Sequence, residues 1–173
     1  PIEGADYAVQ LATFSGVEQQ VRTNQLLADL AAQSNLSNMA QLAGWVGQEA
    51  RSSAPVFLGD AAVTVFYTPA ATADRAVLVA RNTAGDVVAR EDVPLDGSAY
   101  QWTGTDISGK PLPNGTYALT LESYNGEDQL GQAGPVESYA QIMEARGGAT
   151  GATLVLAGGV EVAATEITAL RVP

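Results

Sequence analysis

Two pairs of adjacent acidic residues are the first groups in this sequence that could carry chemistry. The pairs are Glu91–Asp92 and Glu127–Asp128, and two carboxyl groups held together can perform acid–base work or glycoside hydrolysis. Both pairs lie beside turn residues or at the ends of expected strands. Neighbouring residues on a strand point to opposite faces, so neither pair would form a dyad. The pattern favours solvated surface acids over catalytic ones.

The usual nucleophiles and the bases that activate them are also missing. The chain has no Cys and no His, which excludes thiol nucleophiles, Ser-His triads and zinc sites built from thiolate or imidazole. Ser15 and Ser108 precede glycines but stand outside a G-x-S-x-G frame, and no phosphate-binding G-x-x-x-x-G-K-[ST] loop occurs. We therefore expect no enzyme activity, no catalytic residue, no cofactor and no metal.

The densest group of turn residues lies between Trp102 and Tyr117. In this segment Asp106 is expected to accept backbone hydrogen bonds and Tyr117 to form a tyrosine corner. A calcium loop that uses Asp106 and Asn114 is the alternative, but calcium usually needs several carboxylates and only one is local. We favour a structural turn motif made of Trp102, Gly104, Asp106, Gly109, Pro113, Gly115 and Tyr117.

The charge of the chain restricts its partners. Its 173 residues carry a net charge of -11, and its eight basic residues are scattered along the sequence. No basic patch would neutralise phosphates, so nucleic acid and an anionic membrane surface are not expected partners. No apolar run approaches the roughly 20 residues that span a bilayer. The chain begins at Pro1 without Met, which is typical of a fragment or a processed product.

The N-terminal segment has helical periodicity. Apolar residues recur at steps of three and four, and Asp6 is the expected N-cap after Gly4. Ser34–Asn35 is expected to interrupt the helix before a second apolar set that begins at Leu36. Because exposed apolar stripes usually mark interaction sites, we interpret part of the first stripe as a partner-binding face. The stripe contains Tyr7, Leu11, Phe14, Val17 and Val21, extended less regularly by Leu27 and Leu30; the expected contact residues are Leu11, Phe14, Val17 and Val21.

From about Trp45 onward the apolar period changes to two, which is typical of strands. Gly158–Gly159 between two short alternating runs predicts a tight hairpin. Short strands separated by frequent turns indicate an all-β sandwich or barrel. The expected strands are 55–58, 63–68, 76–82, 87–92, 99–102, 116–124, 136–146, 153–156, 160–163 and 167–172.

The chain divides into three parts by texture. Residues 1–44 form the helical segment, and residues 60–133 contain enough strands for a sandwich. Residues 45–59 and 134–173 are each too short for a sturdy core. We expect these two pieces to pair as a small discontinuous barrel, into which the sandwich is inserted.

Three motifs together resemble the flagellar hook-capping family, also called the basal-body rod modification proteins. Residues 10–19 match a Q-L-A-x-F-S-x-V-E-Q signature, and residues 102–117 match W-x-G-x-D-x-x-G-x-x-L-P-x-G-x-Y. The tail, with Gly158–Val160 and then Ile167–Leu170, resembles the closing hairpin and last strand of the family. Tyr7 stands where the family often has Phe, and Thr103 where it often has Asp or Asn.

The resemblance implies both a fold and a role. The fold would be a Tudor-like small β-barrel with an inserted fibronectin III or immunoglobulin-like β-sandwich, preceded by an N-terminal amphipathic helical segment. The role would be a scaffold that caps the growing flagellar hook and holds exported hook subunits until they fold and insert. Its partners would be the hook protein and sister cap subunits in a homo-oligomeric ring. The protein would be exported through the flagellar type III system to the extracellular distal tip of the hook.

A secreted adhesion or carbohydrate-binding sandwich module is the alternative function. Such a module would present a row of exposed aromatic side chains on one face of a sheet. The chain has only two Trp, six Tyr and three Phe, and Trp102 is expected to be buried. The sequence therefore favours the scaffold.

Overall fold

The computed structural model describes residues 3–97, 99–148 and 150–173. The chain divides into two compact units, residues 1–41 and residues 42–173. In chain order the elements are the helix α1 (Gly4–Ala43) and the strands β1 (Glu49–Ser52), β2 (Val56–Leu58), β3 (Val63–Phe66), β4 (Arg75–Arg81), β5 (Val87–Val93), β6 (Tyr100–Trp102), β7 (Gly115–Asn125), β8 (Asp128–Gln129), β9 (Gly134–Pro135), β10 (Glu137–Arg146), β11 (Thr153–Leu156), β12 (Glu161–Ala163) and β13 (Ala169–Arg171), with a short 3-10 turn at Ala164–Glu166.

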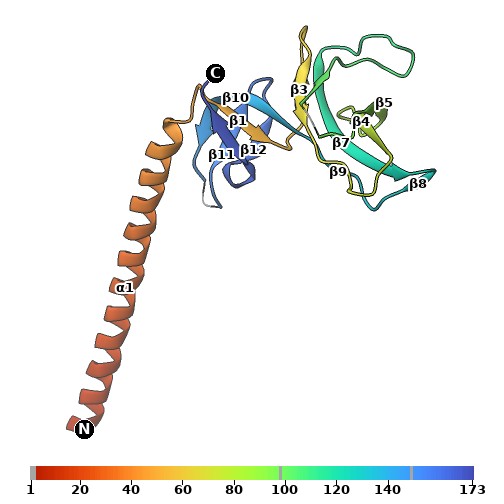
Figure 1. Cartoon of the computed structure of the whole chain (residues 1–173). Coiled ribbons are helices and arrows are strands. Elements are labelled where there is room, and N and C mark those ends of the chain that lie inside the picture. Colours follow the sequence, from red (N-terminus) through yellow and green to blue (C-terminus); the bar gives the residue numbers. More distant parts are fainter. Residues whose placement is uncertain (1–2, 98, 149) are drawn as a thin grey trace. The chain divides into compact units, whose positions relative to one another are not determined.

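The helix α1 is continuous, as Figure 1 shows. The break expected at Ser34–Asn35 is therefore wrong. Ser and Asn cost a helix well under 1 kcal/mol each, and unlike Pro they neither remove a donor nor clash with the preceding turn. The N-cap expected at Asp6 is also wrong, since the helix begins at Gly4. Asp6 lies in the first turn, where its negative charge favours the helix N-terminus.

The helix ends where glycine permits a change of direction. Gly44 follows its last residue, and Gly47 adopts a φ of 91°, which favours glycine. The Gly47 N–H donates to the carbonyl of Ile142 at 2.8 Å, and the Ile142 N–H donates to that of Gln48 at 2.8 Å. These bonds lead the chain into β1. No helix in the described part of the chain is long and apolar enough to cross a membrane.

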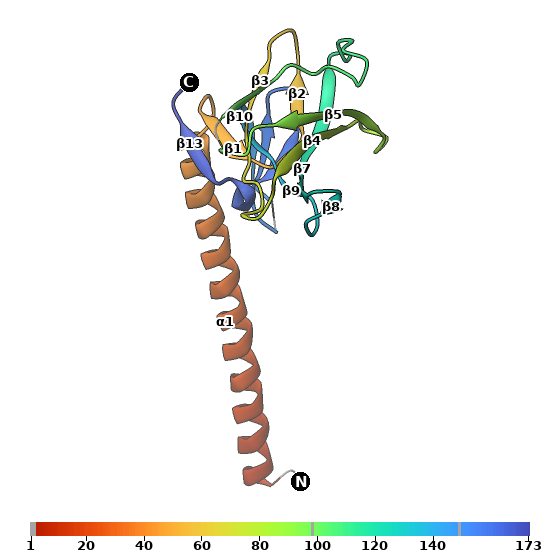
Figure 2. The same ribbon diagram turned by 45° about the vertical axis from the view of Figure 1, so that its right-hand side comes forward.

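Residues 42–173 form two antiparallel sheets. One follows the order β2-β7-β4-β5, with β8 and β9 also paired to β7. The other follows β12-β11-β10-β1-β13, and at its side β3 pairs with β10 and β6 with β3. Figure 2 shows β13 alongside β1 and β5 alongside β4.

Two hydrophobic cores lie within this unit. The first is built around Trp102, Leu78 and Leu121 and includes residues from Val56 to Val136. The second includes Ala50, Ile142, Leu154 and Leu156. Alternation of apolar residues along each strand produces both, because successive side chains point to opposite faces. The mainly β architecture predicted from the sequence is confirmed.

Two details differ from the expected arrangement. Residues 55–58 were expected to form part of the small barrel, but β2 pairs with β7, and Val56 and Leu58 are buried in the first core. Across residues 3–97, 99–148 and 150–173, no ladder joins β12 to β13. The sheet that contains β12 and β13 is therefore open in its pairing where the resemblance implied a barrel.

Candidate functional site

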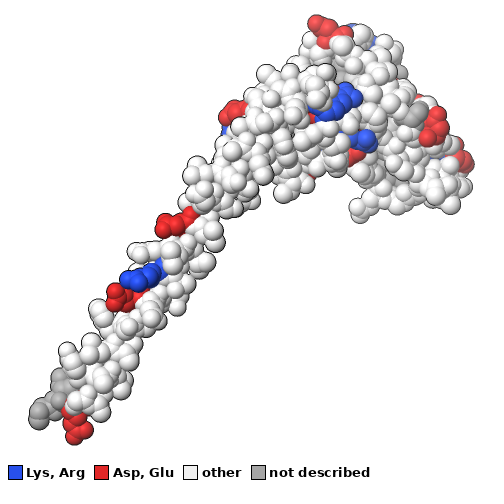
Figure 3. Space-filling view, turned by 60° about the vertical axis from the view of Figure 1, so that its left-hand side comes forward, with Lys and Arg blue, Asp and Glu red and all other residues white. Residues whose placement is uncertain are grey.

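The first candidate site is the surface of α1. Side chains 4–38 are all exposed. Leu11, Phe14, Val17 and Val21 are between 50% and 72% exposed. The charged residues of the helix are only Asp6, Glu18, Arg22 and Asp29, and the helix surface in Figure 3 is correspondingly pale. The helix thus exposes several large apolar side chains and carries few charges.

The apolar residues of α1 occupy two faces. At about 100° per residue, Tyr7, Leu11, Phe14, Val17 and Val21 fall within an arc of roughly 120°. We call these five residues the first face. Leu26, Leu27 and Leu30, the second face, are centred roughly 165° away from it; all three are exposed. Leu27 and Leu30 were expected to extend the first stripe irregularly. The rotation of about 100° per residue places them instead on the other side of the helix.

The turn motif between Trp102 and Tyr117 is a closed local structure. Trp102 is fully buried and its ring contacts that of Tyr117 edge to face, with centroids 5.8 Å apart. The Tyr117 hydroxyl donates to the carbonyl of Pro113 at 2.7 Å, which is the tyrosine corner predicted from the sequence. The Leu112 N–H donates to the carbonyl of Gly104 at 2.8 Å.

Asp106 organises the tip of this motif. Its Oδ1 accepts hydrogen bonds from the Ser108 hydroxyl at 2.6 Å, the Ser108 N–H at 2.8 Å and the Lys110 N–H at 2.9 Å. The Ser108 hydroxyl, followed by the Lys110 N–H, lowers the pKa of Asp106. In the described parts of the chain no three acidic side chains gather closely enough to hold a metal ion. The three hydrogen bonds that Asp106 accepts from Ser108 and Lys110 are those of a structural turn.

The acidic pairs are separated in the fold as expected. Glu91 is half-buried, and burial raises its pKa against a hydrogen bond from Tyr100. Asp92, on the opposite face of β5, lies 3.9 Å from a guanidinium nitrogen of Arg75. Glu127 and Asp128 are exposed beside the turn between β7 and β8. Glu91 and Asp92 thus lie in different surroundings, one half-buried and one beside Arg75.

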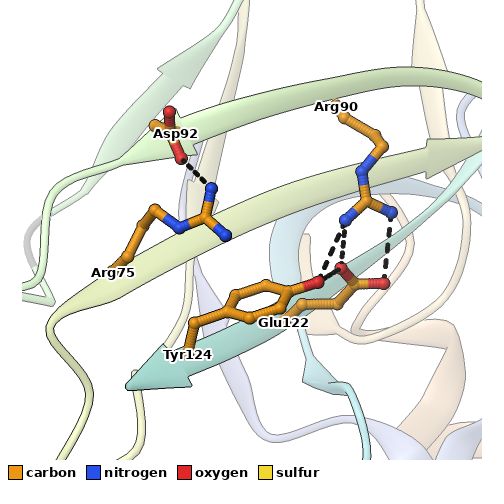
Figure 4. Close-up of polar contacts among 5 residues, drawn as sticks. All are labelled: Arg75, Arg90, Asp92, Glu122 and Tyr124. Carbon is orange, nitrogen blue, oxygen red and sulfur yellow. Dashed lines mark hydrogen bonds and ion pairs between the residues drawn. The ribbon is translucent and has the colours of Figure 1, made fainter. Parts of the chain in front are cut away.

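The most connected polar cluster lies on one face of β4, β5 and β7. Figure 4 shows Arg90 reaching across to Glu122 and Tyr124. Arg90 Nη1 donates to Glu122 Oε1 at 3.3 Å, and the Tyr124 hydroxyl donates to Glu122 Oε2 at 2.6 Å. Burial alone would raise the pKa of Glu122, but the hydrogen bonds from Arg90 and Tyr124 outweigh it, so that pKa is lowered. The cluster joins strands; it holds no uncommitted acid or base.

Comparisons with known proteins agree with the β fold described above. Residues 51–127 match the family model of the FlgD Ig-like domain. A search of curated protein sequences found no match. The adhesive alternative has no support in these comparisons.

Two solved structures share the fold. One is FlgD from Xanthomonas campestris, studied for the hook capping essential for flagellar assembly; the TM-score is 0.59 at 20% identity, over 76% of this chain and 98% of that one. The other is FlgD from P. aeruginosa, with a TM-score of 0.58 at 19% identity, over 73% of this chain and 98% of that one. The chain thus carries an FlgD Ig-like domain and shares the fold of these FlgD proteins, in agreement with the resemblance seen in its sequence.

Proposed function

We propose that this protein is a scaffold that caps the growing hook of a bacterial flagellum. The observation that carries the proposal is the FlgD Ig-like domain at residues 51–127 within an FlgD-type fold. The FlgD of Xanthomonas campestris is associated with hook capping. A cap acts by contact, and the paired or turn-forming carboxylates described above suit a protein without catalysis.

Within this proposal α1 is the element that contacts neighbouring hook or cap subunits. Its first face buries little within its own unit, because its side chains are more than half exposed or close to it. Covering such a side chain with a partner removes apolar area from water, which is worth about 1.5–3 kcal/mol for a full Val, Leu or Phe side chain. Burying the side chains of Leu11, Phe14, Val17 and Val21 would provide a substantial part of the free energy of binding to a specific partner.

The site of action that we propose is the distal tip of the hook, outside the cell. Hook subunits and this protein would arrive there through the flagellar type III channel, and several copies would form a ring. The absence of Cys suits passage through a narrow channel as an unfolded chain, because no disulfide would cross-link it.

The test is the substitution Phe14→Asp in the bacterium that encodes the protein. A charge on the first face opposes desolvation, so hooks should fail to form and hook protein should appear in the medium. Ala12→Asp is the matched control: it adds the same charge two residues away, on the opposite side of the helix. Electron microscopy counts hooks, and an immunoblot measures secreted hook protein.

Two outcomes separate the parts of this proposal. Normal hooks in the Phe14→Asp strain would contradict the role of the first face. Normal hooks in a strain from which the gene is deleted would contradict the capping function itself.

A further inference from the structure

Strand β10 is shared between the two hydrophobic cores. Its first residues, Glu137 and Ser138, pair with Phe66 and Val65 of β3, which packs in the first core. Its later residues pair with β1 and β11, which pack in the second core. A single strand can bend or twist between two cores. Contacts elsewhere are needed if the angle between the cores is to be fixed.

One such contact joins Phe57 to Gly158. Phe57 lies on β2, beside the first core, and its ring is only half covered at 46% exposure. Gly158 lies in the hairpin between β11 and β12 with a φ of 85°. A Cβ added to Gly158 would lie 2.4 Å from Cγ of Phe57. The ring therefore rests against bare backbone that only glycine provides.

A second contact is a ladder of arginine and aromatic side chains. The guanidinium carbon of Arg51 lies 4.3 Å from the ring centroid of Phe66, and Phe66 meets Tyr139 edge to face at 5.7 Å. Arg171 stacks on Tyr139 at 3.9 Å. We call these four residues the Arg–aromatic ladder. It links β3 of the first core to β1, β10 and β13 of the second.

Ion pairs hold the arginines of the ladder in place. Arg51 Nε donates to Glu137 Oε2 at 2.7 Å, and the Thr168 hydroxyl donates to Glu137 Oε1 at 2.9 Å. Arg171 pairs with Glu49. Because each guanidinium is bonded at its edge, its flat face stays over the aromatic ring.

We propose that the Phe57–Gly158 contact and the Arg–aromatic ladder lock the two cores of residues 42–173 into one rigid body. Both contacts border a cavity of about 470 Å³, whose lining includes Phe57, Tyr139 and Arg171. Opening the angle between the cores would separate the walls of this cavity and break both contacts. This proposal about the two contacts does not depend on which partner the protein binds.

The first test compares Gly158→Ala with Gly159→Ala in the full chain. Both glycines have positive φ, at 85° and 78°, so both variants carry the same backbone strain. A Cβ added to Gly159 would have no other atom within 4 Å, whereas a Cβ added to Gly158 would overlap the side chain of Phe57. Gly159→Ala should lower the melting temperature by about 4 °C, and Gly158→Ala by about twice that. In a Phe57→Ala background the two variants should become equal.

The second test measures orientation directly. Residual dipolar couplings from backbone amides should fit one alignment tensor for both cores in the wild-type protein. The double variant Phe57→Ala/Tyr139→Ala should require two tensors while each core keeps its own couplings. Equal melting temperatures for the two glycine variants, or two tensors in the wild type, would overturn the lock, as would a single tensor in the double variant.

Discussion

At the scale of single residues, Gly104 and Gly109 show how one turn motif uses the same residue type for different reasons. Both have positive φ, at 65° and 80°. Gly109 is in open space, whereas a Cβ on Gly104 would lie 2.2 Å from Cδ2 of Leu58. Gly104 therefore satisfies both a backbone conformation and a close approach to β2.

Replacing these two glycines by alanine separates the two requirements. Gly109→Ala should cost about 1–2 kcal/mol of unfolding free energy through backbone strain alone. Gly104→Ala should cost about 1–3 kcal/mol more, because the methyl group overpacks the core against Leu58. Urea denaturation monitored by far-ultraviolet circular dichroism measures both. Equal losses of unfolding free energy would show that Leu58 moves away from the new methyl group at little energetic cost.

Some of these residue contacts could be predicted from the sequence and others could not. The turn at Asp106 and the corner at Tyr117 depend on hydrogen bonds between residues close in the chain, so local spacing is enough to predict them. Gly104 and Gly158 differ from their neighbouring glycines only through Leu58 and Phe57, which are distant in sequence. No pattern in the sequence reveals those contacts.

At the scale of elements, most strands could be predicted from apolar residues at every second position and from the turn residues between these runs, because burial along a strand repeats every second residue. The strands that the pattern missed are β1, β8 and β9, which are four, two and two residues long. β1 reads Glu-Ala-Arg-Ser, and only the pairing of Ala50 between β10 and β13 makes it a strand. In α1 the pattern overestimated the effect of Ser34 and Asn35 on a long helix.

The Glu122 cluster gives the three-stranded face of β4, β5 and β7 a dependence on pH. Glu122 is buried, and its pKa is lowered in the folded protein, mainly by Arg90 and Tyr124 acting against burial. A depressed carboxyl pKa stabilises the fold above the unfolded value, about 4.3, and that stabilisation disappears as the pH falls through the folded value.

Glu122→Gln should therefore lower the unfolding free energy by about 1–2 kcal/mol at pH 7. The difference from the wild type should shrink below pH 4, because protonated Glu122 is also neutral. Urea midpoints between pH 7 and pH 3 test this, with Asp128→Asn, an exposed position at the start of β8, as the control. A difference that is constant over this range would assign the loss to packing rather than to charge.

At the scale of the whole molecule, residues 45–59 and 134–173 are each too short to form a core alone, which predicted that they share one. Ala50 and Ile142 do pack in one cluster. The sharing of β10 between two cores, and the membership of β2 in the first, depend on long-range pairing that periodicity does not encode. We propose module boundaries near Pro55 and Val136, because the first core contains Val56 and Val136 and the second contains Ala54 and Ala140.

Among the described residues, the two hydrophobic cores contain members from Leu42 onward and none from residues 3–41. Deleting residues 1–41 should therefore leave the β unit folded, with a melting temperature within about 5 °C of the full chain, the shift that a change of about 1 kcal/mol produces in a unit of this size. Far-ultraviolet circular dichroism should lose its helical signal. The same truncation should abolish hook formation in the cell, because it removes both apolar faces of α1. A truncated protein that melts much earlier would show that the helix stabilises the β cores, and one that still supports hooks would remove α1 from the capping mechanism.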